Sequence, residues 1–340
     1  MAEIRLVHLS DLHLWRVPRN PLQVIGKRFF GLANLASNRW RKHRKPELQS
    51  VITQALSLRP DHAVIAGDIT LTGLREEFAD AARYLEPLLH LPGGATVIPG
   101  NHDRYGREVV KEALFEEYYG RYLGRELGPP MTYPRIRQHK PLGGFPCLNE
   151  LPHGIKIFSM DISRPILWAS SGKVQGEQEQ IALDWAERLR TPKRNVLMLC
   201  HYPYRKPKGT LARGRHGVVN ARDLEAIVVA LNPPLYLHGH THAPGSYLPA
   251  ATPETWCLDA GSASANFMIG GPRASFIEIL GREIGGIWHW TQRVWLLTRN
   301  GWITQGSLQE PQTIAIRMKE VKKGRVQSTS SSGLRRAVQV

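Results

Sequence analysis

Histidine, aspartate and asparagine side chains recur directly after short apolar runs of this chain. In order they are Asp11, His13, Asp68, Asn101, His102, Asp103, His201, His240 and His242. Imidazole suits Mn, Fe and Zn, whereas carboxylate and amide oxygens suit harder ions, so a mixed set favours borderline divalent metals. Two such ions ~3.5–4 Å apart can screen a phosphoryl group and deprotonate a shared water. The set is therefore suited to hydrolysis of phosphate esters.

The apolar runs predict the strands that must position these side chains. They cover residues 4–10, 62–68, 95–101, 155–161, 195–201 and 234–240. Helices are predicted between them at 46–58, 177–189 and 220–231, from Pro46, an acidic opening and a capping Asn220 respectively. This alternation predicts a layered α/β fold with the site on loops. Glycines at 67, 100 and 239 would let the chain turn sharply beside the ions.

Taken in order, the motifs D-x-H, G-D, G-N-H-D, H and G-H-x-H resemble those of the calcineurin-like metallophosphoesterases, from residue 4 to about 281. The resemblance implies a four-layer α/β/β/α sandwich and two divalent metals, manganese first and iron or zinc as alternatives. It implies that Asp11, His13 and His242 bind one ion. Asn101, His201 and His240 would bind the other, with Asp68 bridging. His102 matches a histidine that contacts the scissile phosphate and assists the leaving group, and Asp103 is expected to orient it. His8 and His238 lie outside the pattern and are expected to be structural.

The positive charge of the chain is concentrated in two segments. The net charge is +16 over 340 residues. Residues 12–46 hold nine Lys/Arg and no acid, and residues 317–340 hold seven with one acid, so together they account for 15 of those charges. A basic excess indicates an anionic partner. Its placement predicts that the partner meets appendages: an amphipathic basic insertion at 14–45 and a disordered basic tail at 319–340. The phosphoesterase domain is predicted at 1–281, with an irregular cap at 124–153, and a Trp-rich extension at 282–318.

Two segments have the composition of lipid-facing elements. Residues 21–37 place apolar side chains on one helical face beside a basic run, which is typical of an interfacial helix. Residues 284–303 hold four of the nine tryptophans, at 288, 290, 295 and 302, and Trp favours the water–lipid boundary. In both cases packing on the core is the open alternative. The basic loop 202–217 is predicted to overhang the site and contact phosphates, or to be simply solvated.

This arrangement is similar to that of the calcineurin-like UDP-2,3-diacylglucosamine pyrophosphatases of bacterial lipid A synthesis. It implies a nucleotide-linked lipid substrate and a cytoplasmic location, peripheral on the inner face of the membrane. Another branch that catalyses this step usually has Arg where His102 stands, and this chain departs from it. Three cysteines with wide spacing, no apolar run of 18 residues and no export signal fit such a location.

Other functions stay open at this level. A cyclic-nucleotide phosphodiesterase would use the same motifs without a lipid-facing helix. A non-catalytic scaffold, such as the phosphoesterase-fold subunit of retromer, is the alternative outside the enzymes, although such scaffolds tend to lose ligands. A DNA nuclease is disfavoured because the body of the chain is nearly neutral, so nucleic acid is not expected as a partner. A protein phosphatase is disfavoured because Gly67-Asp68 continues as Ile-Thr-Leu-Thr. The oligomeric state is left open.

Overall fold

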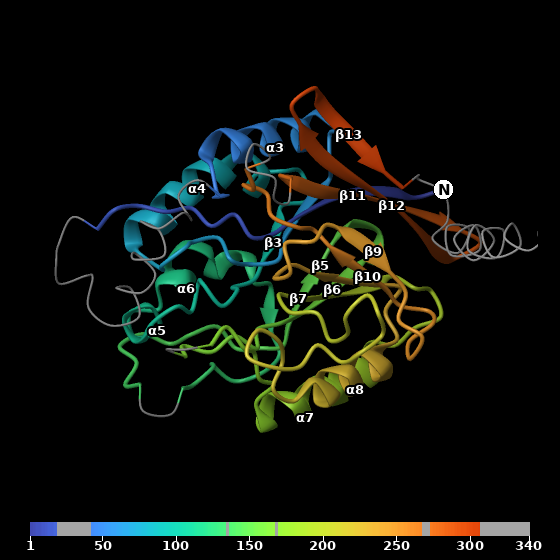
Figure 1. Cartoon of the computed structure of the whole chain (residues 1–340). Helices are drawn as coiled ribbons and strands as arrows, with labels where there is room; N and C mark the ends of the chain where they lie inside the picture. The colour runs from blue at the N-terminus through green and yellow to red at the C-terminus, as the bar shows by residue number, and fades with distance from the viewer. Residues whose placement is uncertain (19–41, 134–135, 167–168, 267–272, 307–340) are drawn as a thin grey trace, which may run out of the picture.

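The computed structural model describes residues 1–18, 42–133, 136–166, 169–266 and 273–306. Two β-sheets lie in the middle of the molecule, with α3 and α4 on one outer side and α7 and α8 on the other (Figure 1). This is the α/β/β/α sandwich expected from the sequence.

The first sheet has the strand order β13-β12-β11-β1-β2-β3. Its three N-terminal strands run parallel, whereas β11, β12 and β13 are added antiparallel on the other side of β1. The bounds are β1 (Glu3–Leu9), β2 (His62–Ile65), β3 (Ala95–Val97), β11 (Ser275–Ile284), β12 (Ile287–Thr298) and β13 (Gly301–Gln305).

The second sheet has the order β4-β5-β6-β7-β8-β10-β9, with a parallel centre from β6 to β10 and antiparallel edges. The bounds are β4 (Arg125–Glu126), β5 (Cys147–Glu150), β6 (Lys156–Met160), β7 (Val196–Cys200), β8 (Leu235–His238), β9 (Gly245–Tyr247) and β10 (Trp256–Asp259).

Three of the four main helices in the described residues begin close to the predicted positions, and the fourth, at 75–89, was not predicted. The four are α3 (Lys45–Ser57), α4 (Arg75–Leu89), α7 (Gly176–Leu189) and α8 (Ala221–Leu231). Shorter turns are α5 (Arg107–Lys111), α6 (Leu114–Tyr119), η3 (Gly120–Tyr122) and η4 (Pro152–Gly154). Pro46 lies in the first turn of α3, as predicted. Asn220 occupies the N-cap position of α8, but its side chain makes no capping bond there and instead pairs with the backbone of Val174.

Alternation along the central strands divides the core in two. Leu197 and Leu199 of β7 face the first sheet, whereas Met198 and Cys200 face α7 and α8. Both faces are apolar because both are covered. The strands therefore read as mainly hydrophobic runs, and the polar side chains of the site follow their carboxyl ends.

The Trp-rich segment completes the core, which was the open alternative to a lipid-facing element. Every second residue of β12 is buried over most of its length, and Trp288 and Trp290 lie in the core between the sheets. Trp295 and Trp302 pack on Phe276, with ring centroids 5.9 and 5.7 Å away. The predicted boundary at residue 281 falls inside β11, so residues 282–305 belong to the first sheet and are not a separate extension.

The predicted cap at 124–153 is partly regular, because its ends form β4 and β5 at the edge of the second sheet. The predicted amphipathic helix at 21–37 and the tail at 319–340 lie outside the described residues. Within the described part of the chain, no helix has the length and hydropathy to cross a membrane.

Candidate metal centre

Five loops bring the predicted residues together at the carboxyl ends of parallel strands. Asp11 and His13 follow β1, Asp68 follows β2, and residues 101–103 follow β3. His201 follows β7, and the pair His240 and His242 follows β8. The carboxyl edges of parallel strands are where α/β folds place ligands. Here the two sheets contribute facing edges, so one cluster forms between them.

Five of the seven predicted ligands have left-handed backbone conformations. The φ angles are positive at Asp11, His13, Asp68, His240 and His242, between 45° and 71°. Side chains other than glycine seldom adopt this region, and such strain is concentrated at functional sites. The left-handed conformations of Asp11 and His13, and not the alternation of side chains along a strand, therefore direct both side chains to the same point.

The first group of ring nitrogens and carboxylates surrounds His13. Its Nε2 lies 3.0 Å from Nε2 of His242, and 3.5 Å from Oδ1 of Asp11. Nε2 of His242 is itself 3.0 Å from the same Asp11 oxygen. Three ligand atoms therefore converge on one point.

The second group surrounds His201. Its Nε2 lies 3.2 Å from Nδ1 of His240 and 3.4 Å from Oδ2 of Asp68. The same Asp68 oxygen is 3.9 Å from Nε2 of His13 in the first group. Asp68 thus stands between the two groups, where the predicted bridging ligand belongs.

Backbone carbonyls set the ring tautomers of the second group. Nδ1 of His201 lies 2.7 Å from the carbonyl of Ala66, and Nε2 of His240 lies 2.8 Å from the carbonyl of His216. A carbonyl can only accept, so each of these nitrogens carries the proton. In the neutral form of both rings, the lone pairs are therefore on the two nitrogens that face each other inside the cluster.

The electrostatics of the cluster favour a cation. Burial opposes ionisation of Asp11, yet His242 and His13 hold the pKa of its carboxyl well below the usual range. Burial also acts to lower the pKa of His201, but the charge of Asp68 outweighs it and raises this pKa to about 10. Protons on histidines here neutralise buried carboxylates, and a divalent cation would do so more completely.

Unsatisfied buried oxygens give an independent test of whether metals fit. Oδ1 of Asn101 is buried and accepts no hydrogen bond within the described residues, and the buried Oδ1 of Asp11 has only the ring nitrogens of His13 and His242 beside it, at 3.5 and 3.0 Å. A buried oxygen without a partner costs about 1–3 kcal/mol. Asp11 is a predicted ligand of one ion and Asn101 a predicted ligand of the other, so the residues present fit a pair of divalent cations.

Comparison with known families agrees with this geometry. A family model described as calcineurin-like phosphoesterase matches residues 4–244. The chain belongs to this family. Members typically bind divalent metals and hydrolyse phosphate esters. No curated protein gives a significant match.

Solved structures similar to this member of the family share little sequence with it. A conserved uncharacterized protein from Streptococcus pneumoniae, a predicted phosphoesterase, is 13% identical, with 90% of this chain and 99% of that chain covered and a TM-score of 0.36. Vps29 from Entamoeba histolytica complexed with Zn²⁺ is 12% identical, with 89% and 98% covered and a TM-score of 0.39. A putative 5'-nucleotidase from Staphylococcus aureus is 12% identical, with 94% and 58% covered and a TM-score of 0.46. At these identities and scores the likenesses say nothing about the reaction.

The G-N-H-D motif of the family is arranged differently from the sequence-based expectation. Nδ1 of His102 lies 2.6 Å from the backbone carbonyl of Leu71, so this carbonyl orients the ring. Asp103 instead accepts backbone hydrogen bonds from Ile69, Thr70 and Gly100 at 2.9–3.0 Å. Its predicted role of orienting His102 is therefore corrected: Asp103 fastens the loop after β2 to the loop after β3.

His8 and His238 occupy structural positions, as expected. Nε2 of His8 lies 3.0 Å from the carbonyl of His238, and both rings are fully buried. Burial lowers the pKa of His8 to about 4 and that of His238 to about 3. Both rings are therefore neutral spacers between the two sheets.

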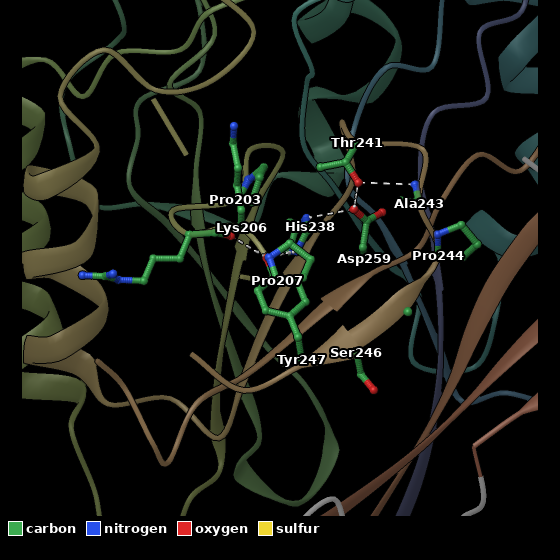
Figure 2. A pocket seen from close by; sticks show the side chains of 12 residues that line it. Pro203, Lys206, Pro207, His238, Thr241, Ala243, Pro244, Ser246, Tyr247 and Asp259 are labelled. Atoms are coloured by element: carbon green, nitrogen blue, oxygen red, sulfur yellow. Dashed lines mark hydrogen bonds and ion pairs between the residues drawn. The ribbon is translucent and has the colours of Figure 1, made fainter. Parts of the chain in front are cut away.

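Sequence reasoning missed Asp259, which supports the loop carrying His240 and His242. The hydroxyl of Thr241, between those two histidines, donates to Asp259 at the end of β10. Figure 2 shows Thr241 and His238 directed toward Asp259 inside a pocket that Lys206, Pro207 and Tyr247 also line. The apolar run ending in Asp259 was the available signal, because it has the same form as the runs that end in ligands.

Sequence reasoning also missed His43, which is 7% exposed and lies against His13 with ring centroids 4.5 Å apart. It lies in the basic segment, where the many Lys and Arg residues gave no indication of a metal ligand.

The predicted basic loop 202–217 does reach the site, because the backbone carbonyl of His216 contacts the ring of His240.

Proposed function

We propose that this chain is a metal-dependent hydrolase of phosphodiester or pyrophosphate bonds. The observation that carries the proposal is the pair of ligand groups, one around His13 and one around His201, that meet at Oδ2 of Asp68. A bound metal pair would screen the charge of the phosphoryl oxygens and acidify the attacking water.

The protein's own residues supply proton transfer and positioning. Nδ1 of His102 is held by the carbonyl of Leu71, so Nε2 is the nitrogen that can carry a proton for the substrate. Nitrogens and oxygens of His102, His13 and Asp68 lie within 4.8 Å of one another, which places the imidazole at the edge of the cluster. In this position His102 donates a proton to the departing oxygen.

The substrate we favour is UDP-2,3-diacylglucosamine, split to UMP and the acylated sugar phosphate. Two features support a nucleotide pyrophosphate on a lipid. The loop 202–217 reaches the site and carries exposed cations, among them Lys206, Lys208 and Arg213, which suit a second phosphate. The basic segment 12–46 suits an anionic membrane surface, and a peripheral position on the cytoplasmic face of the membrane is part of the proposal. The tryptophans of β12 and β13 no longer count as support, because they pack in the protein.

The decisive experiment is a substrate screen of purified, manganese-loaded protein. It should compare phosphomonoesters, phosphodiesters, 3',5'-cyclic nucleotides and UDP-2,3-diacylglucosamine, with products identified by mass spectrometry. We expect UMP and the acylated sugar phosphate. Asp68→Ala and Asn101→Ala should lower the rate by orders of magnitude, whereas Asp184→Ala, which removes an exposed carboxylate on α7, should not. Fast turnover of cyclic AMP would favour a cyclic-nucleotide phosphodiesterase. No turnover of any ester would favour a scaffold.

Membrane contact is tested separately with vesicles. Binding to vesicles that contain anionic lipid should weaken as ionic strength rises, because each basic side chain adds about 1 kcal/mol that salt screens. Phe29→Ser with Leu32→Ser should release the protein while hydrolysis of a small soluble diester is kept. Equal binding to neutral and anionic vesicles would contradict the proposal.

A further inference from the structure

His43 enters the metal centre from the end of the basic segment, and its backbone is fixed there. The N–H of Arg44 donates to the carbonyl of Ser264 at 2.9 Å, and the N–H of Asn266 donates to the carbonyl of Lys42 at 2.8 Å. These bonds flank an isolated antiparallel bridge between His43 and Ala265. The residue therefore has a defined position against the strand-linking segment 262–266.

A second contact holds the basic segment from both ends. Asp80 of α4 accepts a hydrogen bond from Nη2 of Arg16 at 2.8 Å and one from Nζ of Lys45 at 2.9 Å. Arg16 lies just before the part of the segment that is not described, and Lys45 lies just after His43. One buried carboxylate thus fastens both ends of the segment beside the site.

The imidazole of His43 is directed at the first group of ligands. Its ring centroid lies 4.5 Å from that of His13 and 5.6 Å from that of His242. One ring nitrogen from each of these three histidines lies within 4.8 Å of the other two. Three imidazoles so close together repel one another once they are protonated, and a shared cation would remove this repulsion.

The Nδ1 atom of His43 is hydrogen-bonded to a side chain of the segment 262–266. Its Nδ1 lies 3.0 Å from the hydroxyl oxygen of Ser264. The neighbouring hydroxyl of Ser262 donates to the carbonyl of Asp11 at 2.7 Å, so the same short segment also positions an established member of the first group. When Nδ1 donates to the hydroxyl of Ser264, the lone pair is on Nε2, and this tautomer is the one that could bind an ion.

We infer that His43 is a third imidazole ligand of the ion held by Asp11, His13 and His242, beyond the set that the family's motifs supply. The inference rests on the proposed metal centre. A third nitrogen donor would shift this ion's preference toward borderline metals such as Zn, Fe or Co. It would also make the basic segment part of the metal centre, so that binding of this ion stabilises the packing of residues 42–44.

The test is metal binding, not turnover. The experiment compares His43→Ala and His43→Gln with a control variant, His90→Ala, at the exposed end of α4. Each protein is stripped of metal with a chelator and titrated with Co²⁺, and binding is followed by calorimetry and by the visible spectrum. We expect two ions in the unchanged protein and in His90→Ala. Both His43 variants should bind one ion at least ~10-fold more weakly, with an altered spectrum. Ser264→Ala, which keeps the imidazole but removes its partner, should show a smaller loss.

The possible outcomes separate the inference from the proposed function. If folded His43 variants bind two Co²⁺ ions with unchanged affinity and an unchanged spectrum, the inference is overturned and the proposed function is not. This holds even if the KM for a substrate rises in these variants. An unchanged protein that binds no Co²⁺ would overturn both. Unfolding temperatures of the metal-free proteins establish folding. If the two His43 variants fail to fold, unchanged Co²⁺ affinity and spectrum in Ser264→Ala would overturn the inference.

Discussion

Oδ1 of Asp68 accepts a hydrogen bond from the backbone N–H of His102 at 2.7 Å. The bond joins the loop after β2 to the loop after β3, and it leaves Oδ2 of Asp68 toward the histidines of both groups. The residue between the two metal sites and the residue assigned to the leaving group are therefore positioned by one contact.

Replacement of His102 by alanine should lower the rate and keep the metals, because the backbone N–H that binds Asp68 is retained. A general acid contributes roughly 10²–10⁴-fold. The loss should be smaller for p-nitrophenyl esters, whose leaving group needs no proton. Rates on good and poor leaving groups, with metal content by mass spectrometry, check this. Loss of metal from the variant would assign His102 to an ion instead.

Gly100→Ala should disrupt the centre from a neighbouring position. A Cβ at residue 100 would lie 2.3 Å from Oδ1 of Asp68 and 2.4 Å from its backbone nitrogen, so the Asp68 loop must move. We expect weaker metal binding and a lower unfolding temperature. Gly176→Ala is the control, because a Cβ there meets no atom within 4 Å. Equal metal affinity in both variants would show that the loop tolerates the displacement.

Asp80→Asn should weaken the attachment of the basic segment in a pH-dependent way. The hydrogen bond from Arg16 is the largest cause that lowers the pKa of Asp80, from 3.8 to about 2. A lowered pKa stabilises the folded state above pH ~3.8, and this contribution is lost as the pH falls toward 2. We expect a deficit of about 1 kcal/mol in the free energy of unfolding, discounted because Arg16 is half exposed. Urea unfolding of both proteins should give a constant difference from pH 5 to 7 and a smaller one at pH 3. A difference that grows on acidification would contradict the assignment.

The three cysteines should be unreactive in the native protein. Cys147, Cys200 and Cys257 are buried and free of disulfides. Burial raises the pKa of the Cys200 and Cys257 thiols to about 12, so little thiolate forms near neutrality. Ellman's reagent at pH 8 should titrate no thiol in the native state and three after denaturation in guanidinium. Rapid reaction of a native thiol would indicate local opening of a central strand.

The sequence by itself determined the strands and the residues at their carboxyl ends. Buried parallel strands require mainly apolar runs, so polar residues gather where a run stops, and Asp11, Asp68 and His201 could be found in this way. The alternation of strands and helices also predicted a layered α/β fold, and the resemblance to the metallophosphoesterases implied the sandwich.

Only the tertiary structure decided which partners meet across the chain. The β-bridge between His43 and Ala265 holds His43 where it contacts His13. The carbonyl of Leu71 orients His102, a role for which the sequence suggested Asp103. Backbone carbonyls leave no sequence signal, because every residue has one. The tryptophans of β12 could not be assigned locally either, since a lipid surface and a protein core both favour aromatic side chains. Pairing of β12 with β11 decided between them by placing Trp288 and Trp290 between the two sheets, where packing removes them from solvent.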